Sequence, residues 1–205
     1  MVEPLTPAQF AAAANVSRET QRRLEAYAEL LLRWQRAVNL VANSTIPDLW
    51  RRHMLDSAQL VFYLPTTPCR LADLGSGAGF PGLVLAILGV GEVHLVESDG
   101  RKCAFLREAL RVTGTAAFVH EERIESVRLT GCDVVTARGL ASLEVLVGYA
   151  RPFLKSSGIG LFLKGRRLEE ELTPNLKGGN MRLERFPSVT EPGGWVVRLG
   201  DIAHV

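Results

Sequence analysis

The first third of the chain carries apolar residues at helical spacing. From Ser17 onward they recur every three or four positions, at Leu24, Tyr27, Leu31, Trp34 and Val38. This is the period of a single buried stripe on a helix, and Ser17 can cap its start. A second helical stretch is expected from about Pro47 to Tyr63, closed by Pro65. Residues 1–65 are therefore expected to form a helical extension.

From Arg70 onward the hydrophobic pattern changes to short apolar runs that alternate with helical ones. The runs predict strands at 70–74, 92–97, 116–120, 132–136 and 159–163, with helices at 80–89, 101–112 and 142–151. Two later segments, MRLERF after Asn180 and WVVRL near the C-terminus, predict edge strands. Alternation of this kind indicates an α/β fold, a mainly parallel sheet covered by helices on both faces. Residues 66–205 would form this core and pack with the extension as one compact unit.

Composition narrows the class of protein. Of 205 residues, 47% are hydrophobic and 22% are charged, which excludes a disordered chain. The formal net charge of +2 permits a nucleic acid partner without requiring one. The longest apolar run, Gly82 to Val90, is too short to cross a bilayer, and the acidic Glu3 does not suit a secretory leader. We therefore expect a cytoplasmic protein without membrane contact.

The three cysteines, Cys69, Cys103 and Cys132, form no CxxC pair and lie near no histidine cluster. Neither a disulfide framework nor a zinc site is indicated, so we expect a reduced protein with no metal. One histidine and one aspartate, as at His53 and Asp56, are likewise too few ligands for a metal site.

A glycine-rich loop, LADLGSGAGFPG at residues 71–82, offers the clearest chemistry in the chain. Gly75, Gly77 and Gly79 follow a predicted strand and precede a predicted helix, where the backbone can turn tightly and expose N–H groups to a ligand. This arrangement indicates a nucleotide-type site. Residues 77–82 also fit GxGxxG, the dinucleotide pattern, although a lone match of that kind is weak. The register after the strand suits Gly75, Gly77 and Gly79 better.

Two acidic residues stand near this loop in the predicted sheet. Glu97 ends the next predicted strand, 20 residues after Gly77, a spacing that suits a carboxylate accepting hydrogen bonds from ribose hydroxyls. A ribose is common to dinucleotides and S-adenosylmethionine. Asp73 precedes the loop, where its charge would repel a pyrophosphate and attract the ammonium and sulfonium groups of S-adenosylmethionine. The pattern therefore favours S-adenosylmethionine, while either carboxylate could instead be a solvated strand end.

Five further motifs accompany the loop along the chain. They are NLVANST at 39–45, RRHMLDS at 51–57, RIES at 123–126, TARGLASL at 136–143 and FLKG at 162–165. With these motifs the sequence, from about residue 20 to 172, resembles the bacterial small-subunit rRNA guanine-N7 methyltransferases, the RsmG or GidB family. The closing stretch GGWVVRLGDIAHV lies outside the resemblance.

The resemblance implies a class I, Rossmann-like methyltransferase that uses S-adenosylmethionine and no metal. The acceptor would be N7 of one guanine in 16S rRNA near the decoding centre, presented as naked rRNA or within the small ribosomal subunit. Carried over by motif, Gly75 and Phe80 would line the cofactor and Glu97 would hold its ribose. Ile124 and Glu125 would contact its adenine.

The resemblance also points to residues outside the glycine loop. Arg138, in TARGLASL, would lie near the methionine end of the cofactor and the acceptor. Asn39, His53 and Asp56 would face the cofactor cleft. From the residues alone, Asn39 could equally cap the end of the long helix. His53 and Asp56, three apart on a helix, could form a buried hydrogen-bonded pair.

Methyl transfer to guanine N7 makes few chemical demands. N7 carries a lone pair and no proton, so no general base is needed and residues that position the base should dominate. A cation such as Arg138 or Lys164 could orient the guanine through O6 or a neighbouring phosphate, although each could also be a solvated charge. Seven basic residues are candidates for phosphate contact: Arg51, Arg52, His53, Arg101, Lys102, Arg166 and Arg167.

Three other functions stay open at this point. A methyltransferase of the same fold could act on a small molecule or a protein, and would turn over without RNA. A nicotinamide-dependent dehydrogenase is disfavoured by Asp73 and by the glycine register, and would bind NAD. A non-enzymatic RNA-binding module would leave the glycine loop without a use. In the leading interpretation the protein acts as a monomer.

Overall fold

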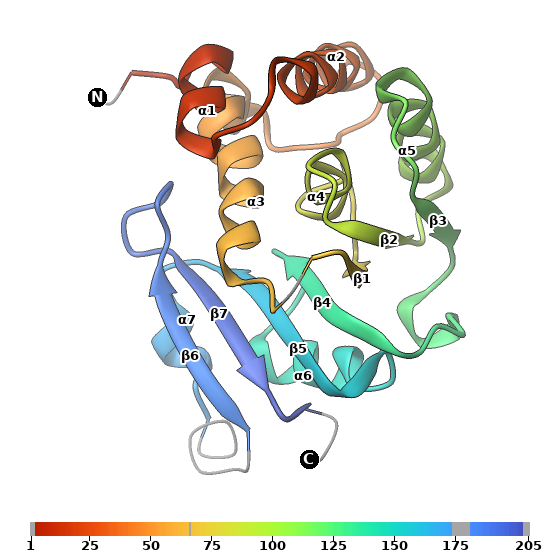
Figure 1. Ribbon diagram of the computed structural model, residues 1–205, viewed down its shortest axis with the longest axis vertical. Helices are drawn as coiled ribbons and strands as arrows, with labels where there is room; N and C mark the ends of the chain where they lie inside the picture. The colour runs from red at the N-terminus through yellow and green to blue at the C-terminus, as the bar shows by residue number, and fades with distance from the viewer. Residues whose placement is uncertain (1–2, 66, 174–180, 203–205) are drawn as a thin grey trace.

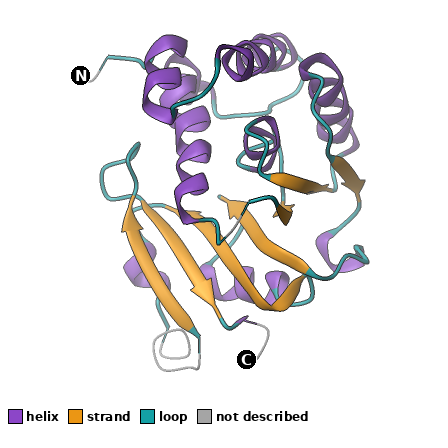
Figure 2. Ribbon diagram, in the orientation of Figure 1, coloured by secondary structure: helices purple, strands orange, loops and turns teal. Residues whose placement is uncertain are grey.

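The computed structural model describes residues 3–65, 67–173 and 181–202 and builds them around one seven-stranded sheet (Figures 1 and 2). The strands are β1 (Cys69–Leu74), β2 (Gly91–Glu97), β3 (Phe118–Glu121), β4 (Cys132–Arg138), β5 (Leu154–Lys164), β6 (Arg182–Pro187) and β7 (Trp195–Gly200). Their order is β3-β2-β1-β4-β5-β7-β6, and β1 to β5 pair in parallel. The prediction of a mainly parallel sheet is confirmed.

The two C-terminal strands differ from expectation in one respect. β7 pairs antiparallel with both β5 and β6, so β6 is the edge strand and β7 lies inside the sheet. The prediction of an edge strand is therefore wrong for β7, where the adjacent Val196 and Val197 are both fully buried. Consecutive buried residues indicate a strand covered on both faces. The order also departs from the 3-2-1-4-5-6 order of dinucleotide-binding sheets by the insertion of β7.

Helices cover the N-terminal third, as the apolar spacing predicts. Ser17 caps α2 (Arg18–Trp34), because its Oγ accepts a 3.1 Å hydrogen bond from a backbone N–H of the first turn. The apolar pattern does not predict a shorter helix, α1 (Pro7–Ala14), because its run of alanines forms no apolar stripe on one face. Its sequence signals are the capping box that Thr6 forms with Gln9 and the proline at its first position, Pro7.

The helix predicted at 47–63 is present as a helical run of mixed winding. It passes from a 3₁₀ segment (Asn43–Asp48) through a π-helical turn (Trp50–Leu55) and the short α3 (Asp56–Ala58) to a second 3₁₀ segment (Gln59–Tyr63). π-helical turns are rare and occur frequently at functional sites. This one carries the RRH motif.

Helices enclose the sheet on both faces (Figure 1). One face is covered by α2, α4 (Gly82–Ile87) and α5 (Gly100–Thr113), and the other by α6 (Leu143–Ala150) and α7 (Leu168–Glu171). The aromatic residues of α2 pack against Phe105 of α5, so the extension and the sheet share one hydrophobic cluster. Within the part of the chain that the structure describes, no helix is long and apolar enough to span a membrane.

Candidate active site

The glycine loop leaves β1 in left-handed backbone conformations. Gly75, Gly77 and Gly79 have φ angles of +65°, +57° and +96°, a region that L side chains rarely occupy. The Gly77 N–H donates to Glu97 Oε2 at 2.9 Å, which joins the loop to the end of β2. A Cβ added to Gly77 would meet only the Gly75 carbonyl oxygen, at 3.8 Å, an ordinary van der Waals contact. The loop therefore presents bare backbone to a cavity.

The glycine-loop cavity has a volume of about 370 Å³, within the range of small-ligand pockets. It lies at the carboxyl ends of β1, β2 and β4, where an open parallel sheet collects its loops. Six residues predicted to bind a cofactor line it: Gly75, Gly77, Glu97, Ile124, Glu125 and Arg138.

Glu97 is the buried acid of this cavity and is only 8% exposed. Both carboxylate oxygens accept backbone hydrogen bonds, Oε2 from Gly77 at 2.9 Å and Oε1 from Asp99 at 2.8 Å. A carboxylate offers about four acceptor positions, so both oxygens can still accept from a ribose. The geometry permits the predicted role of Glu97, which stays a prediction.

Asp73 does not reach the cavity. It is fully buried beneath the loop, where it accepts hydrogen bonds from Thr136 Oγ1 at 2.7 Å and from the Gly82 N–H at 3.1 Å. Burial raises the pKa of this carboxyl to about 6. Its carboxylate joins the loop to β4 and to the start of α4, so it does not line the cavity itself. The predicted effect of its charge on the choice between the two classes of nucleotide stays a prediction.

Gly79 and Phe80 also lie outside the cavity lining, contrary to expectation. A Cβ on Gly79 would lie 2.7 Å from the Cβ of Leu83, so this glycine permits close packing of α4. Phe80 is buried, and its ring lies 4.9 Å beneath the Arg138 guanidinium. His53 packs on the same ring, with 4.9 Å between centroids. Phe80 therefore supports Arg138 and His53, which line the cavities, whereas Gly79 serves the packing of α4.

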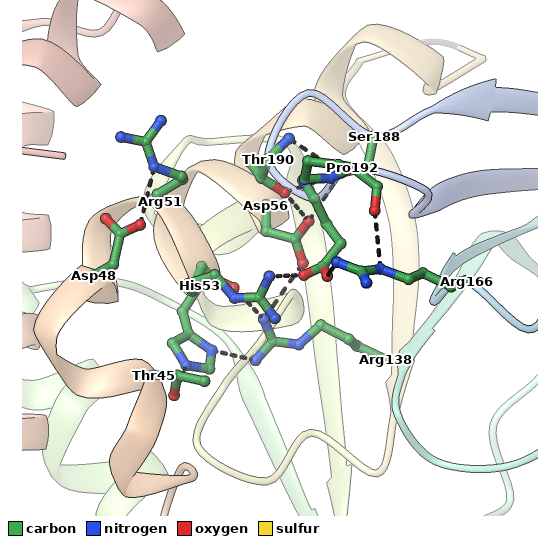
Figure 3. A network of polar contacts seen from close by, with 12 residues as sticks. Thr45, Asp48, Arg51, His53, Asp56, Arg138, Arg166, Ser188, Thr190 and Pro192 are labelled. Carbon is green, nitrogen blue, oxygen red and sulfur yellow. Dashed lines mark hydrogen bonds and ion pairs between the residues drawn. The ribbon is translucent and has the colours of Figure 1, made fainter. Parts of the chain in front are cut away.

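Polar contacts converge on Arg138 (Figure 3). Its Nη2 donates to His53 Nδ1 at 2.7 Å, and its Nη1 donates to the Arg52 carbonyl at 3.1 Å. Asp56 Oδ2 lies 3.5 Å from the same Nη1. The guanidinium is thereby held between β4 and the helical run 43–63. The predicted pairing of His53 with Asp56 is wrong, since both side chains turn to Arg138 in the described structure.

His53 is neutral in this arrangement. Burial, followed by the charges of Arg138 and Arg52, lowers its pKa to about 3. Because Nδ1 accepts from Arg138, the ring proton is assigned to Nε2, which donates to Thr45 Oγ1 at 2.7 Å. That hydroxyl donates in turn to the Ala42 carbonyl at 2.7 Å. The imidazole is thus a fixed acceptor for Arg138.

A second cavity, of about 540 Å³, adjoins the first at Arg138 and Gly139, which line both. We call it the hairpin cavity, because the hairpin that joins β6 to β7 (residues 188–194) forms one wall. The helical run 43–63 supplies another wall through the RRHMLDS motif, and the end of β5 supplies a third.

Asp56 anchors the hairpin to the helical run. Thr190 Oγ1 donates to Asp56 Oδ1 at 2.5 Å, and Gln59 Nε2 donates to the same oxygen at 2.9 Å. The Val189 N–H donates to Gln59 Oε1 at 3.1 Å. The sequence analysis missed Thr190 because it lies in no motif and is 134 residues from its partner. No local signal in the sequence could have found it.

Lys164 ends β5 at the border of the hairpin cavity, and its side chain is 8% exposed. Its Nζ donates to the Ala141 carbonyl at 2.8 Å and pairs with Glu171 Oε2 at 2.6 Å. The alternative of a solvated strand-end lysine is therefore wrong. An ammonium has three donors, so one N–H of Lys164 stays available to a ligand.

Comparisons with known proteins identify the family of this chain. The family model GidB, described as rRNA small subunit methyltransferase G, matches residues 20–186. The chain belongs to the GidB family. A Paramagnetospirillum magneticum protein named ribosomal RNA small subunit methyltransferase G is 55% identical over 198 residues, 97% of each chain. A protein of the same name from Rhodospirillum rubrum is 54% identical over 97% of this chain and 98% of its own.

A solved structure extends the agreement to the fold. A mutant of MtNAS in complex with S-adenosylmethionine superposes on the GidB chain with a TM-score of 0.61 at 12% identity. The superposition covers 96% of this chain and 84% of that one. The GidB chain thus has the Rossmann-like fold of class I S-adenosylmethionine-dependent methyltransferases, as its resemblance implied.

Asn39 of the GidB chain does not face the cleft. Helix α2 ends at Trp34, and the exposed Asn39 follows outside both cavity linings. Gln35 fixes this turn instead, because its Oε1 accepts from the N–H groups of Leu40 and Val41, each at 3.0 Å. The predictions of a helix cap and of a cleft residue are both wrong for Asn39, since the helix ends before reaching it.

The predicted phosphate contacts occupy different surroundings. Arg51 and Arg101 pair with aspartates of their own segments, at 2.9 and 3.5 Å, and Lys102 lines the glycine-loop cavity. The others lie around the hairpin cavity or the depression beside it: Arg52, His53, Arg166 and Arg167. Among the described residues, no cluster of histidine, cysteine and acidic side chains could hold a metal ion.

Proposed function

We propose that this protein transfers the methyl group of S-adenosylmethionine to N7 of one guanine in 16S rRNA near the decoding centre. One observation carries the proposal: Arg138 lines both cavities, so ligands bound in the two would meet at its side chain. The names of the close relatives support the choice of small-subunit rRNA. A ribosomal substrate places the protein in the cytoplasm.

The residues of the glycine-loop cavity fit S-adenosylmethionine. Gly77 lines the cavity, and a Cβ on it would have no neighbour nearer than 3.8 Å, so a ligand can lie against bare backbone there. Gly75 and Gly77 would hold the methionine portion, Glu97 the ribose, and Ile124 and Glu125 the adenine. When bound, this cofactor supplies an electrophilic methyl group on a sulfonium.

The chain's own groups suit an acceptor that carries no proton. His53 has a pKa of about 3 and both ring nitrogens in hydrogen bonds, so it takes no proton from a substrate near neutral pH. Guanine N7 needs no such base. Arg138 and Lys164 keep N–H groups that can donate to O6, on the same edge of guanine as N7. These two residues would hold the base in line for transfer.

Each cation at the hairpin cavity stands beside a carboxylate. N7-methylguanosine is cationic, and unpaired positive charges would repel it as it forms. Paired charges keep the surroundings close to neutral. The pairs are Arg138 with Asp56, Lys164 with Glu171, and Arg52 with Glu191.

The test is incubation of the purified protein with methyl-labelled S-adenosylmethionine and unmethylated small ribosomal subunits. Nucleoside analysis and chain scission specific to N7-methylguanosine then locate the label. We expect one labelled guanine near the decoding centre. Bound cofactor without label on subunits or on naked 16S rRNA would contradict the proposal and favour a small-molecule or protein acceptor. Binding of NAD in place of S-adenosylmethionine would favour a dehydrogenase.

A further inference from the structure

Two arginines from distant parts of the chain converge on one carboxylate of the β6–β7 hairpin. Arg52 forms an ion pair with Glu191 Oε2, and Arg166 Nη2 lies 3.5 Å from Glu191 Oε1. Arg166 Nε also donates to the Pro192 carbonyl at 3.1 Å, as Figure 3 shows. Among the described residues, Glu191 is the one carboxylate that pairs with either arginine.

This carboxylate stands on the rim between two hollows. Glu191 and Lys164 line the hairpin cavity and also an adjoining depression of about 800 Å³, whose wall includes Arg166 and Arg167. Arg166 and Arg167 lie beyond this rim, so an RNA backbone that follows these basic residues from a guanine in the hairpin cavity would cross it. A phosphate beside that guanine would therefore arrive where Glu191 now lies.

A carboxylate and a phosphate offer guanidinium groups the same kind of partner, a set of anionic oxygens that accept hydrogen bonds in pairs. We propose that Glu191 occupies the site of an RNA backbone phosphate next to the acceptor guanine. In the free protein its carboxylate keeps Arg52 and Arg166 in position, and the phosphate replaces it on binding. This inference rests on the proposed function, because it assigns a subsite of the same cleft.

The exchange requires only a rotation of the Glu191 side chain. That side chain is 26% exposed, and the two arginines are 39% and 72% exposed, so water reaches the pair. Exposed ion pairs of this kind are weak, and a phosphate can displace the carboxylate. The hairpin backbone stays in place, because Ser188 N–H donates to the Gly194 carbonyl at 2.9 Å and Gly194 N–H to the Glu191 carbonyl at 2.8 Å.

The test is Glu191→Gln, which keeps the size of the side chain and removes its charge. Binding of the protein, saturated with S-adenosylmethionine, to unmethylated small ribosomal subunits is measured at several salt concentrations. We expect Kd to fall by about three- to tenfold, because no carboxylate competes with the phosphate. The gain should disappear in an Arg52→Gln background. Glu184→Gln, which removes the Arg198 pair from the same two strands, is the matched control and should leave Kd unchanged.

An unchanged or higher Kd for Glu191→Gln would overturn the inference, since a carboxylate that only fastens the hairpin would weaken binding when neutralised. If Glu191→Gln lowers thermal stability, the inference is tested instead by the salt dependence of binding of the Arg52→Gln variant. It should reduce the slope of log affinity against log salt by about 0.7, the loss of one single-stranded phosphate contact, and an unchanged slope overturns the inference. If the wild-type protein neither binds nor methylates subunits, that result contradicts the proposed function, and the phosphate site proposed here fails with it.

Discussion

The two cavities that meet at Arg138 are built in different ways. The glycine-loop cavity is lined within residues 75–149, by backbone and loops that follow successive strands. The hairpin cavity is lined by four separate stretches, 40–56, 138–139, 163–165 and 188–195, through long side chains held in ion pairs. The first depends on the absence of side chains, and the second depends on their fixed orientation. Substitutions should therefore affect cofactor binding and acceptor positioning separately.

Gly77→Val should have the largest effect and should damage only the glycine-loop cavity. The added side chain would project into the cavity and strain a φ of +57°, so we expect affinity for S-adenosylmethionine to fall by at least about 100-fold. Gly89→Val is the matched control, because Gly89 has a φ of +78° and open space outside both cavities. It should lose about 1–2 kcal/mol of stability and keep its affinity. Calorimetric titration separates the two, and equal losses of affinity would contradict the assignment.

Arg138→Lys should have the next largest effect. Because Arg138 lines both cavities, this variant should distinguish acceptor positioning from cofactor binding. Lysine keeps the charge but cannot reach His53, the Arg52 carbonyl and Asp56 together. We expect kcat to fall by about 100-fold through misplacement of the acceptor, and the Kd of S-adenosylmethionine to change far less. Arg101→Lys, outside the hairpin cavity, serves as the control. A loss of cofactor affinity as large as the loss of kcat would show that Arg138 acts in cofactor binding and does not position the acceptor.

His53→Gln should alter the pH dependence of stability. The folded-state pKa of about 3 lies below the usual 6.5, so the unfolded chain takes up a proton first as pH falls below 6.5, and stability is lost. At pH 5 this loss is about 2 kcal/mol for one histidine. Glutamine can still accept from Arg138 and donate to Thr45, but it does not titrate. Urea unfolding at pH 8 and pH 5 should show a larger loss in the wild type, and equal losses would contradict a neutral His53.

The raised pKa of Asp73 changes the free energy of unfolding with pH in the opposite direction in the same experiment. Its folded-state value of about 6 lies above the usual 3.8, so its contribution to stability is present below 3.8 and is lost as pH rises through 6. Both proteins keep Asp73, so this contribution cancels between wild type and His53→Gln. The difference between the two proteins therefore reports on His53.

Thr190→Val should have the smallest effect, because it removes one hydrogen bond of the hairpin while keeping the side-chain shape. Asp56 Oδ1 would lose its 2.5 Å donor but keep Gln59. We expect a loss of about 1 kcal/mol of unfolding free energy and a reduction of kcat by a few fold. Thr190→Ser should restore both values, since it keeps the hydroxyl. Unaltered turnover with normal cofactor binding would show that the hairpin does not position the acceptor.

The elements that follow a clear period were predictable. Strands β1 to β5 and helix α2 show their hydrophobic pattern over enough residues to be recognised. Each is buried on one or two faces, so its apolar residues recur at the spacing of a strand or a helix. Helix α1 has no apolar stripe, and the sequence of β7 predicts an edge strand although β6 pairs with it on its outer side. The sequence predicts a helix at 47–63 but not the π-helical winding of Trp50–Leu55, which brings the His53 ring and the Arg52 carbonyl to Arg138.

Local sequence accounts for the glycine-loop cavity and not for the hairpin cavity. Gly75 and Gly77 adopt positive φ angles, and Glu97 meets the loop because neighbouring parallel strands end together. The partners of Arg138 lie about 85 residues away in the chain, and Thr190 lies 134 residues from Asp56. Backbone preferences act over a few residues, so they leave a readable motif. Which side chain neutralises a buried charge depends on the segments that the folded core brings together, and that was settled only in three dimensions.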